Sequence, residues 1–160
     1  MKKILFILTF AAFAAPCPAQ GMGGRLGLGI RGSNLAARYF ATDSVGTELV
    51  TALKTVAPET GADTTLYYLG CGAFYNRAVA DNVYFQTGSM LAYSTGMNAD
   101  KFYGQWYLVP AFAGAEVILS NRFGIDFRVH PAEIMLYNTG GATTKSVWSL
   151  YGSLGAHYYF

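Results

Sequence analysis

The sequence predicts an all-β fold, a small antiparallel up-and-down β-barrel that crosses a membrane with its strands. The 160-residue chain is rich in aromatic residues (16%) and contains 19 glycines, yet only 12% of its residues are charged. Beyond Ala15 it has no apolar run of the about 20 residues that a membrane-spanning helix needs, whereas barrel strands need only about 9 to 11. Several segments alternate apolar and polar residues with the period of two that is typical of strands.

The N-terminus has the pattern of a secretory signal peptide. Lysines at positions 2 and 3 precede the apolar run 4–15, which is too short to span a bilayer. Cys17 and Ala19 occupy positions −3 and −1 of a cleavage site before Gln20. We therefore expect residues 1–19 to be removed during export and residues 20–160 to form one barrel domain.

The two cysteines add one alternative and exclude one feature. In a lipoprotein, Cys17 would become the lipidated first residue, but Pro16 precedes it and no Leu stands three residues before it. Cys71 is the only cysteine left after the predicted cleavage, so the mature chain cannot form an internal disulfide. We interpret Cys71 as a small apolar surface residue rather than a redox group.

The charge balance excludes nucleic acid as a partner. Removal of two signal-peptide lysines lowers the Lys+Arg count from 11 to 9, which equals the Asp+Glu count of 9. A neutral chain without a Lys/Arg stripe lacks the electrostatic footprint of a nucleic-acid-binding protein. No HExxH or CxxC motif occurs, and Gly27-Leu28-Gly29 lies in a strand pattern without a following helix, so we expect neither a metal nor a cofactor.

The C-terminal segment is the clearest strand. Its alternate residues, counted back from the end, are apolar or Gly, namely Phe160, Tyr158, Ala156, Leu154, Gly152, Leu150 and Trp148. The residues between them are small, polar or amphipathic, and they include Tyr159 and His157. This segment therefore has the two distinct faces of a barrel strand.

Five further segments show the same period, which makes six strands. They span residues 25–33, 67–75, 83–93, 107–119 and 123–130. From Phe123, the odd positions are apolar and the even positions are not; from Tyr107 to Leu119, all odd positions are apolar, which predicts one continuous lipid-facing row. Pro131 interrupts the fifth segment, and we expect Ile134 and Leu136 to continue its apolar face after a bulge.

The connections predict which end of the barrel lies outside. Turns at 80–82 and 120–122 are short, whereas the stretches 41–65, 95–102 and 139–146 are longer and polar. Outer-membrane barrels have short periplasmic turns and longer extracellular loops, so both termini are expected to be periplasmic. Within the first long stretch, Leu49, Leu53 and Val56 have helical spacing, which predicts a short helix over 47–56.

Alternation alone does not decide which face meets lipid. A soluble periplasmic lipocalin-like barrel that carries a small hydrophobic ligand has the same period with its faces reversed. The polar faces here hold few Lys and Glu, unlike a solvated exterior. Trp and Tyr gather near strand ends, as in the aromatic girdles of membrane barrels, and include Trp106, Tyr107, Trp148, Tyr158 and Tyr159. Both observations favour the membrane.

The C-terminal row resembles the signal by which outer-membrane barrels are passed to the barrel assembly machinery, a terminal aromatic preceded by alternate apolar residues. The candidate signal consists of Leu154, Ala156, Tyr158 and Phe160. Three further segments resemble the PorT-like family of small outer-membrane β-barrels, namely Gly29-Ile30-Arg31-Gly32-Ser33-Asn34-Leu35, Val83-Tyr84-Phe85-Gln86-Thr87-Gly88 and Tyr107-Leu108-Val109-Pro110. The resemblance implies eight strands, the bacterial outer membrane, and the lipid bilayer and assembly machinery as partners. Leu108 departs from it, since the family often has an acidic residue there.

With the apolar faces toward lipid, the opposite faces line the lumen. Their ionisable residues are Arg25, Arg31, Glu116, Asp126, Arg128, His130, Glu133 and His157. Side chains fill the interior of a barrel of about eight strands, so we expect a structural network of ion pairs and hydrogen bonds. The sequence thus predicts a structural or interaction role with surface-exposed loops.

The enzymatic alternative is an outer-membrane hydrolase or acyltransferase. It would use His130 or His157 as the base, Asp126 or Glu133 to orient that base, and Ser149 or Ser153 as the nucleophile. These residues show no motif spacing, so we assign no catalytic residue.

Overall fold

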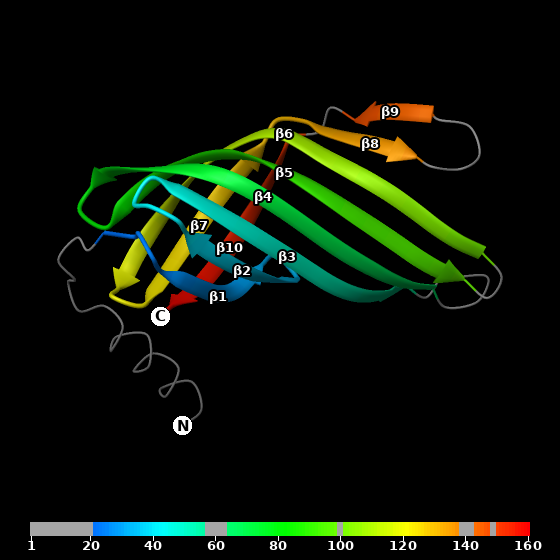
Figure 1. Cartoon of the computed structure of the whole chain (residues 1–160). Helices are drawn as coiled ribbons and strands as arrows, with labels where there is room; N and C mark the ends of the chain where they lie inside the picture. The colour runs from blue at the N-terminus through cyan, green and yellow to red at the C-terminus, as the bar shows by residue number, and fades with distance from the viewer. Residues whose placement is uncertain (1–20, 57–63, 99–100, 138–142, 148–149) are drawn as a thin grey trace, which may run out of the picture.

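The computed structural model describes residues 21–56, 64–98, 101–137, 143–147 and 150–160, which form ten strands (Figure 1). The strands are β1 (Leu26–Arg31), β2 (Asn34–Phe40), β3 (Val45–Val56), β4 (Thr64–Ala80), β5 (Val83–Asn98), β6 (Lys101–Ser120), β7 (Phe123–His130), β8 (Glu133–Tyr137), β9 (Thr143–Val147) and β10 (Tyr151–Tyr159). No helix in the described part of the chain is long and apolar enough to cross a membrane. The predicted signal peptide lies outside the described residues.

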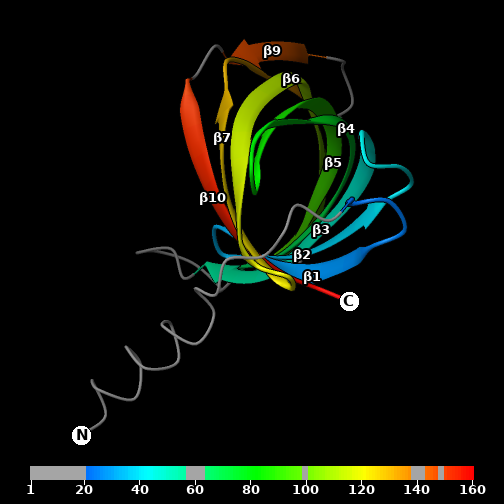
Figure 2. The same ribbon diagram turned by 90° about the vertical axis from the view of Figure 1, so that its left-hand side faces the viewer.

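Eight of these strands close into a ring, which Figure 2 shows nearly end-on. β1 to β6 each pair antiparallel with the next strand, and β10 pairs with both β7 and β1. The closing seam joins Gly27 to Tyr159 and Arg31 to Gly155. The antiparallel up-and-down barrel is therefore confirmed with eight strands, and the six strands found by alternation alone were too few.

The two strands missed in the sequence are β2 and β3. The helix predicted over 47–56 is wrong, because these residues belong to β3, which pairs with β2 from Leu35–Thr51 to Phe40–Gly46. β3 is a two-faced strand, with Glu48 and Val50 buried and Leu49 exposed between them. The spacing of Leu49, Leu53 and Val56 fits a helix, yet tertiary pairing on both sides overrides that local signal.

Long loops were predicted where strands continue. β5 runs to Asn98 and β6 begins at Lys101, so most of the stretch 95–102 is strand, and residues 143–146 of the stretch 139–146 belong to β9. β4, β5 and β6 contain 17, 16 and 20 residues, whereas β1 and β2 contain only 6 and 7. A membrane-crossing strand needs about 9 to 11 residues, so β4 to β6 are longer than this length and β1 and β2 are shorter. The barrel therefore has one tall wall and one low wall (Figure 1).

The alternation of faces is confirmed in most strands. Large apolar side chains point outward and are exposed, as at Leu28 (48%), Phe127 (51%) and Leu154 (62%). On the opposite faces of β7 and β10, Asp126 and His157 are fully buried. An exterior of exposed apolar groups around an interior of buried charges reverses the arrangement of a soluble protein.

β6 departs from the predicted single row of lipid-facing residues. Val109 and Phe112 are both buried, although they have opposite parity. The step from Val109 to Phe112 lies opposite the shorter step from Met90 to Gly88 on β5, which marks a bulge. The extra residue at this bulge, beside Pro110, reverses the facing of the β6 residues that precede it. Val109 therefore points into the barrel, and the prediction that it faces lipid is wrong.

The two strands on either side of Pro131 follow one line along the barrel wall. β7 ends at His130 and β8 begins at Glu133, because a proline has no N–H to donate to the ladder. Both strands pair with β6 in one register, Val129 with Ala113 and Ile134 with Leu108. β8 therefore extends the line of β7, and β9 pairs with it beyond the closed ring.

An apolar layer closes the end of the barrel that carries the short turns. Seven buried side chains form it, namely Met22, Phe40, Phe74, Tyr84, Phe112, Ile118 and Tyr159. Met22 comes from the segment that precedes β1. A hydrogen bond from the Gly23 N–H to the Asp43 carboxylate (2.7 Å) holds this segment to the turn between β2 and β3. The layer leaves the lumen closed at this end.

Candidate functional site

The central feature of the lumen is a cluster of six buried charges, which we call the charge cluster. Its members are Arg31 on β1, Arg38 on β2, Glu48 on β3, Glu116 on β6, and Asp126 and Arg128 on β7. No side chain in it is more than 6% exposed. Three guanidinium groups face three carboxylates, so the cluster is neutral as a whole.

Arg38 lies at the centre of the charge cluster and contacts all three carboxylates. Its Nε donates to Glu48 (3.0 Å), its Nη1 to Glu116 (3.2 Å) and its Nη2 to Asp126 (2.8 Å). A planar guanidinium with five N–H groups suits this arrangement, because each edge can serve a different acceptor. Arg38 thereby connects β2 with the opposite wall of the barrel.

The other two arginines complete the ion pairs. Arg31 Nη2 donates to Glu48 (3.0 Å) and to Asp126 (2.8 Å), which joins β1 to β3 and β7. Arg128 Nη1 donates to the second oxygen of Glu48 (2.5 Å), and its guanidinium lies 4.2 Å from the centroid of the Phe112 ring. Glu48 thus contacts all three arginines.

Neutral groups satisfy the remaining acceptors. Gln86 donates to Glu116 (2.7 Å) and accepts from Arg128 Nη2 (3.1 Å), and the Tyr159 hydroxyl donates to Glu116. His157 Nε2 lies 2.9 Å from an Asp126 oxygen. Buried charges are tolerated when they are both paired and hydrogen-bonded, and this cluster meets both conditions.

The structure brings five of the eight predicted luminal residues together, namely Arg31, Glu116, Asp126, Arg128 and His157. The other three lie elsewhere. Arg25 donates to the backbone oxygen of Asn121 at the short-turn end (2.9 Å), Glu133 is only half-buried on β8, and His130 contacts Ser153.

Sequence reasoning missed two members of the charge cluster, Arg38 and Glu48, and the hydrogen-bond partner Gln86. Arg38 and Glu48 belong to the two strands that were not found, and Gln86 carries no charge. A signal for β2 was present, since Leu35, Ala37 and Tyr39 alternate with Ala36, Arg38 and Phe40. That alternation would have placed Arg38 in the lumen.

The residues of the enzymatic alternative do not assemble into a triad. His130 Nε2 lies 3.0 Å from Ser153 Oγ, but its Nδ1 is buried without a hydrogen-bond partner among the described residues. A catalytic histidine needs an acidic group at that second nitrogen. Asp126 contacts the other histidine, His157, and Ser153 also accepts a bond from Arg31 (3.2 Å). Ser149 lies outside the described residues.

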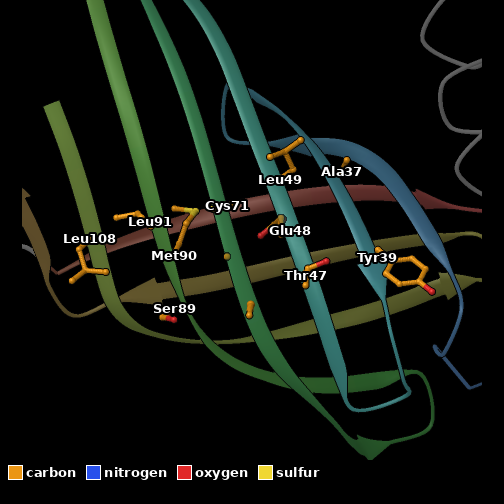
Figure 3. Close-up of a pocket in the computed structure, with 12 residues that line it drawn as sticks. Ala37, Tyr39, Thr47, Glu48, Leu49, Cys71, Ser89, Met90, Leu91 and Leu108 are labelled. Carbon is orange, nitrogen blue, oxygen red and sulfur yellow. The ribbon is translucent and has the colours of Figure 1, made fainter. Parts of the chain in front are cut away.

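The described residues contain no group of three or more His, Cys, Asp or Glu side chains that could hold a metal ion. A shallow groove of about 600 Å³ lies on the outer face of the barrel, across β2 to β6 (Figure 3). Small outward side chains such as Ala37, Thr47, Cys71 and Ser89 form it, between larger ones such as Leu49 and Leu91. Cys71 is exposed there, on the apolar face.

The solved structures that resemble the chain include two bacterial proteins. The N-terminal β-barrel domain of Pseudomonas aeruginosa OprF matches with a TM-score of 0.52 and 15% identity, over 86% of this chain and 98% of that domain. The chain shares the fold of that domain, a closed antiparallel β-barrel. Ail, the attachment invasion locus protein of Yersinia pestis, gives a TM-score of 0.44 and 17% identity, over 87% of this chain and all of that chain. No protein-family model matches the sequence, and no curated protein does.

Proposed function

We propose that this protein is a bacterial outer-membrane β-barrel with a structural or interaction role, a side-chain-filled lumen and no catalytic activity. The observation that carries the proposal is the reversed distribution of polarity. The exterior carries exposed apolar side chains on every strand of the ring, whereas arginines and carboxylates are buried inside. In water this exterior would aggregate; in a bilayer it meets acyl chains.

The soluble alternative fits the structure less well. A periplasmic carrier of a hydrophobic ligand would need an apolar lumen and a charged exterior. Here the centre of the lumen holds three ion-paired arginines, and Leu28, Leu49, Leu69 and Phe127 are each about half exposed on the outside. An apolar ligand could enter at this level only by separating these ion pairs, and breaking a buried ion pair is costly.

The closed lumen supports a role other than conduction. An ion moving along the axis would meet the apolar layer around Phe74 and then the charge cluster around Arg38, and both are fully packed with side chains. We therefore expect the purified protein to show no stable conductance in a planar bilayer.

The interaction role rests on the tall wall. β3 to β6 and the β8–β9 hairpin rise past the closed ring on the side that we propose to be extracellular (Figure 1). A rigid sheet held above a membrane is suited to contact a partner outside the cell. Membership of the PorT-like family, the signal peptide over 1–19 and recognition of the C-terminal row by the barrel assembly machinery remain parts of this proposal.

Fractionation of cells that express the full chain tests the proposal. We expect the protein in the outer-membrane fraction, extractable only with detergent, and a gel mobility that changes on heating because small barrels resist unfolding in the gel buffer at low temperature. A soluble, periplasmic protein with heat-independent mobility would refute the membrane placement and favour the carrier alternative.

A further inference from the structure

The low wall of the barrel ends inside the region that faces lipid. β1 and β2 are joined by the tight turn at Gly32 and Ser33, far short of the end of the tall wall (Figure 1). The last pair between β2 and β3 is Leu35 with Thr51. The last pair between β1 and β10 is Arg31 with Gly155, followed by one bond from the Gly32 N–H to the Leu154 oxygen (2.8 Å).

Beyond this turn, two strands have unpaired edges. Within the described residues, β3 from Ala52 to Val56 pairs only with β4. On the other side, β10 from Tyr151 to Ser153 pairs only with β7. Among the residues that the structure describes, the ring of eight strands is thus closed at the level of the charge cluster and open above the turn.

The lipid-facing surface continues past the turn on both sides of this opening. On the β3 side, Leu53 is 68% exposed and its partner on β4, Tyr67, is 54% exposed. On the β10 side, Leu150 is 77% exposed, four residues before Leu154. Large apolar side chains at these positions indicate that the opening lies at the depth of the bilayer rather than above it.

Unpaired backbone at this depth needs hydrogen-bond partners. Open sheet edges are not found in direct contact with hydrocarbon, and irregular backbone at this depth lines a cavity that admits water or polar groups. The structure contains such a cavity next to the turn. Its volume is about 460 Å³, within the range of small-molecule sites, and it is lined by Ser33, Asn34, Ala52, Leu53, Leu66, Tyr68 and Ser94.

The cavity belongs to the upper lumen and has a closed floor. Ala52 and Ser94 have the same parity as Val50 and Ala92, which are buried inside the barrel. Val50, Ala92 and Ala36 are each less than 5% exposed and lie between the cavity and the charge cluster. A molecule that enters the cavity from the side therefore cannot continue along the axis.

We infer that the opening is a lateral entrance through which an acyl chain of an outer-leaflet lipid occupies the upper lumen. The inference rests on the proposed membrane placement. Ala52, Leu53 and Leu66 offer apolar contacts to methylene groups. Hydroxyl and amide groups of Ser33, Asn34, Tyr68 and Ser94 bind the water and ester oxygens that accompany the lipid and serve the strand edges. The bilayer supplies this ligand at the mouth of the cavity.

A quenching experiment tests the entry of lipid. A small fluorophore is attached to Ser94→Cys, in the lumen, in a Cys17→Ala/Cys71→Ala background that leaves no other thiol. The full chain is refolded into phosphatidylcholine bilayers that contain lipids with a nitroxide on the acyl chain. The matched control carries the fluorophore at Leu69→Cys, on the lipid-facing side of the neighbouring strand. We expect both labels to be quenched.

A variant that fills the cavity separates entry from quenching through the wall. Ala52→Phe should remove most of the quenching at position 94 and leave that at position 69 unchanged; Asn34→Phe, at the mouth, serves the same purpose if Ala52→Phe does not refold. Heat-modifiable mobility verifies folding. Quenching at 69 but not at 94, or quenching at 94 that survives both substitutions, would overturn the lateral entrance. Absence of quenching at both positions in the folded protein would instead refute the membrane placement, and the entrance with it.

Discussion

Removal of the Arg38 guanidinium should destabilise the barrel strongly. The side chain is fully buried and its three donors contact Glu48, Glu116 and Asp126 at 2.8 to 3.2 Å. Arg38→Met retains the aliphatic stem but leaves the charge cluster with one unbalanced carboxylate. Breaking a buried ion pair by removing one partner costs about 3 to 5 kcal/mol, so we expect the free energy of unfolding to fall by about that amount.

A second substitution identifies charge imbalance as the cause. Asp126→Asn alone leaves an unbalanced positive charge, whereas the double variant Arg38→Met/Asp126→Asn retains two arginines and two glutamates and is neutral again. The double variant should therefore lose less stability than the sum of the single variants, by about 0.5 to 3 kcal/mol, the range measured for residues in contact. Urea unfolding in lipid vesicles, followed by tryptophan fluorescence, measures all three values.

The control is an exposed arginine that donates a hydrogen bond but forms no ion pair among the described residues. Arg122 donates to the Tyr158 hydroxyl (3.2 Å) in the turn between β6 and β7, where both groups are accessible to water. Arg122→Met should change the unfolding free energy by less than about 1 kcal/mol. Strict additivity of the two single substitutions in the charge cluster, or an equal loss at Arg122, would refute the reasoning.

Three further outcomes are expected. Phe127→Arg, on the lipid face, should lower the refolding free energy in membranes by about 2 to 4 kcal/mol, while Ser94→Arg, beside the luminal cavity, should be tolerated; equal costs would show that the faces are wrongly assigned. Deletion of Phe160 should lower outer-membrane abundance in cells with near-normal refolding in detergent, and unchanged abundance would show that this residue is not read as a signal. Gly29→Ala should prevent closure, because a Cβ there overlaps the Ala156 carbonyl oxygen, whereas Gly70→Ala should leave heat-modifiable mobility intact.

The sequence predicts a strand wherever the two faces differ in character. In β7, apolar Ile125 and Phe127 alternate with Asp126 and Arg128, and the period is plain. β6 is different, because apolar and small residues occupy both faces near Pro110. A bulge of one residue leaves no trace in such a pattern, so the reversal at Val109 was invisible before the register was known.

The membership of the charge cluster depends on closure of the ring, which sequence alone does not specify. Luminal facing could be inferred for Asp126 and Arg31 from their own strands. That Arg31 contacts both Asp126 and Glu48 could not be inferred. The contact between Arg31 and Asp126 spans 95 residues. His130 and Glu133 are ionisable residues on the polar faces of their segments, as the cluster members are. They lie further along the barrel axis, and a residue's position along that axis depends on strand tilt and stagger.

The distribution of the six charges along the chain bears on how the barrel closes. Arg31, Arg38 and Glu48 precede residue 50 and sum to one positive charge, whereas Glu116, Asp126 and Arg128 follow residue 115 and sum to one negative charge. Before the seam between β1 and β10 forms, the two ends of the unclosed sheet therefore attract each other. A seam displaced by one residue would turn Arg31 outward into the lipid and leave its carboxylate partners unmatched, which is costly in a bilayer. The same ion pairs that fill the lumen thus favour the observed register of the seam over one displaced by a residue.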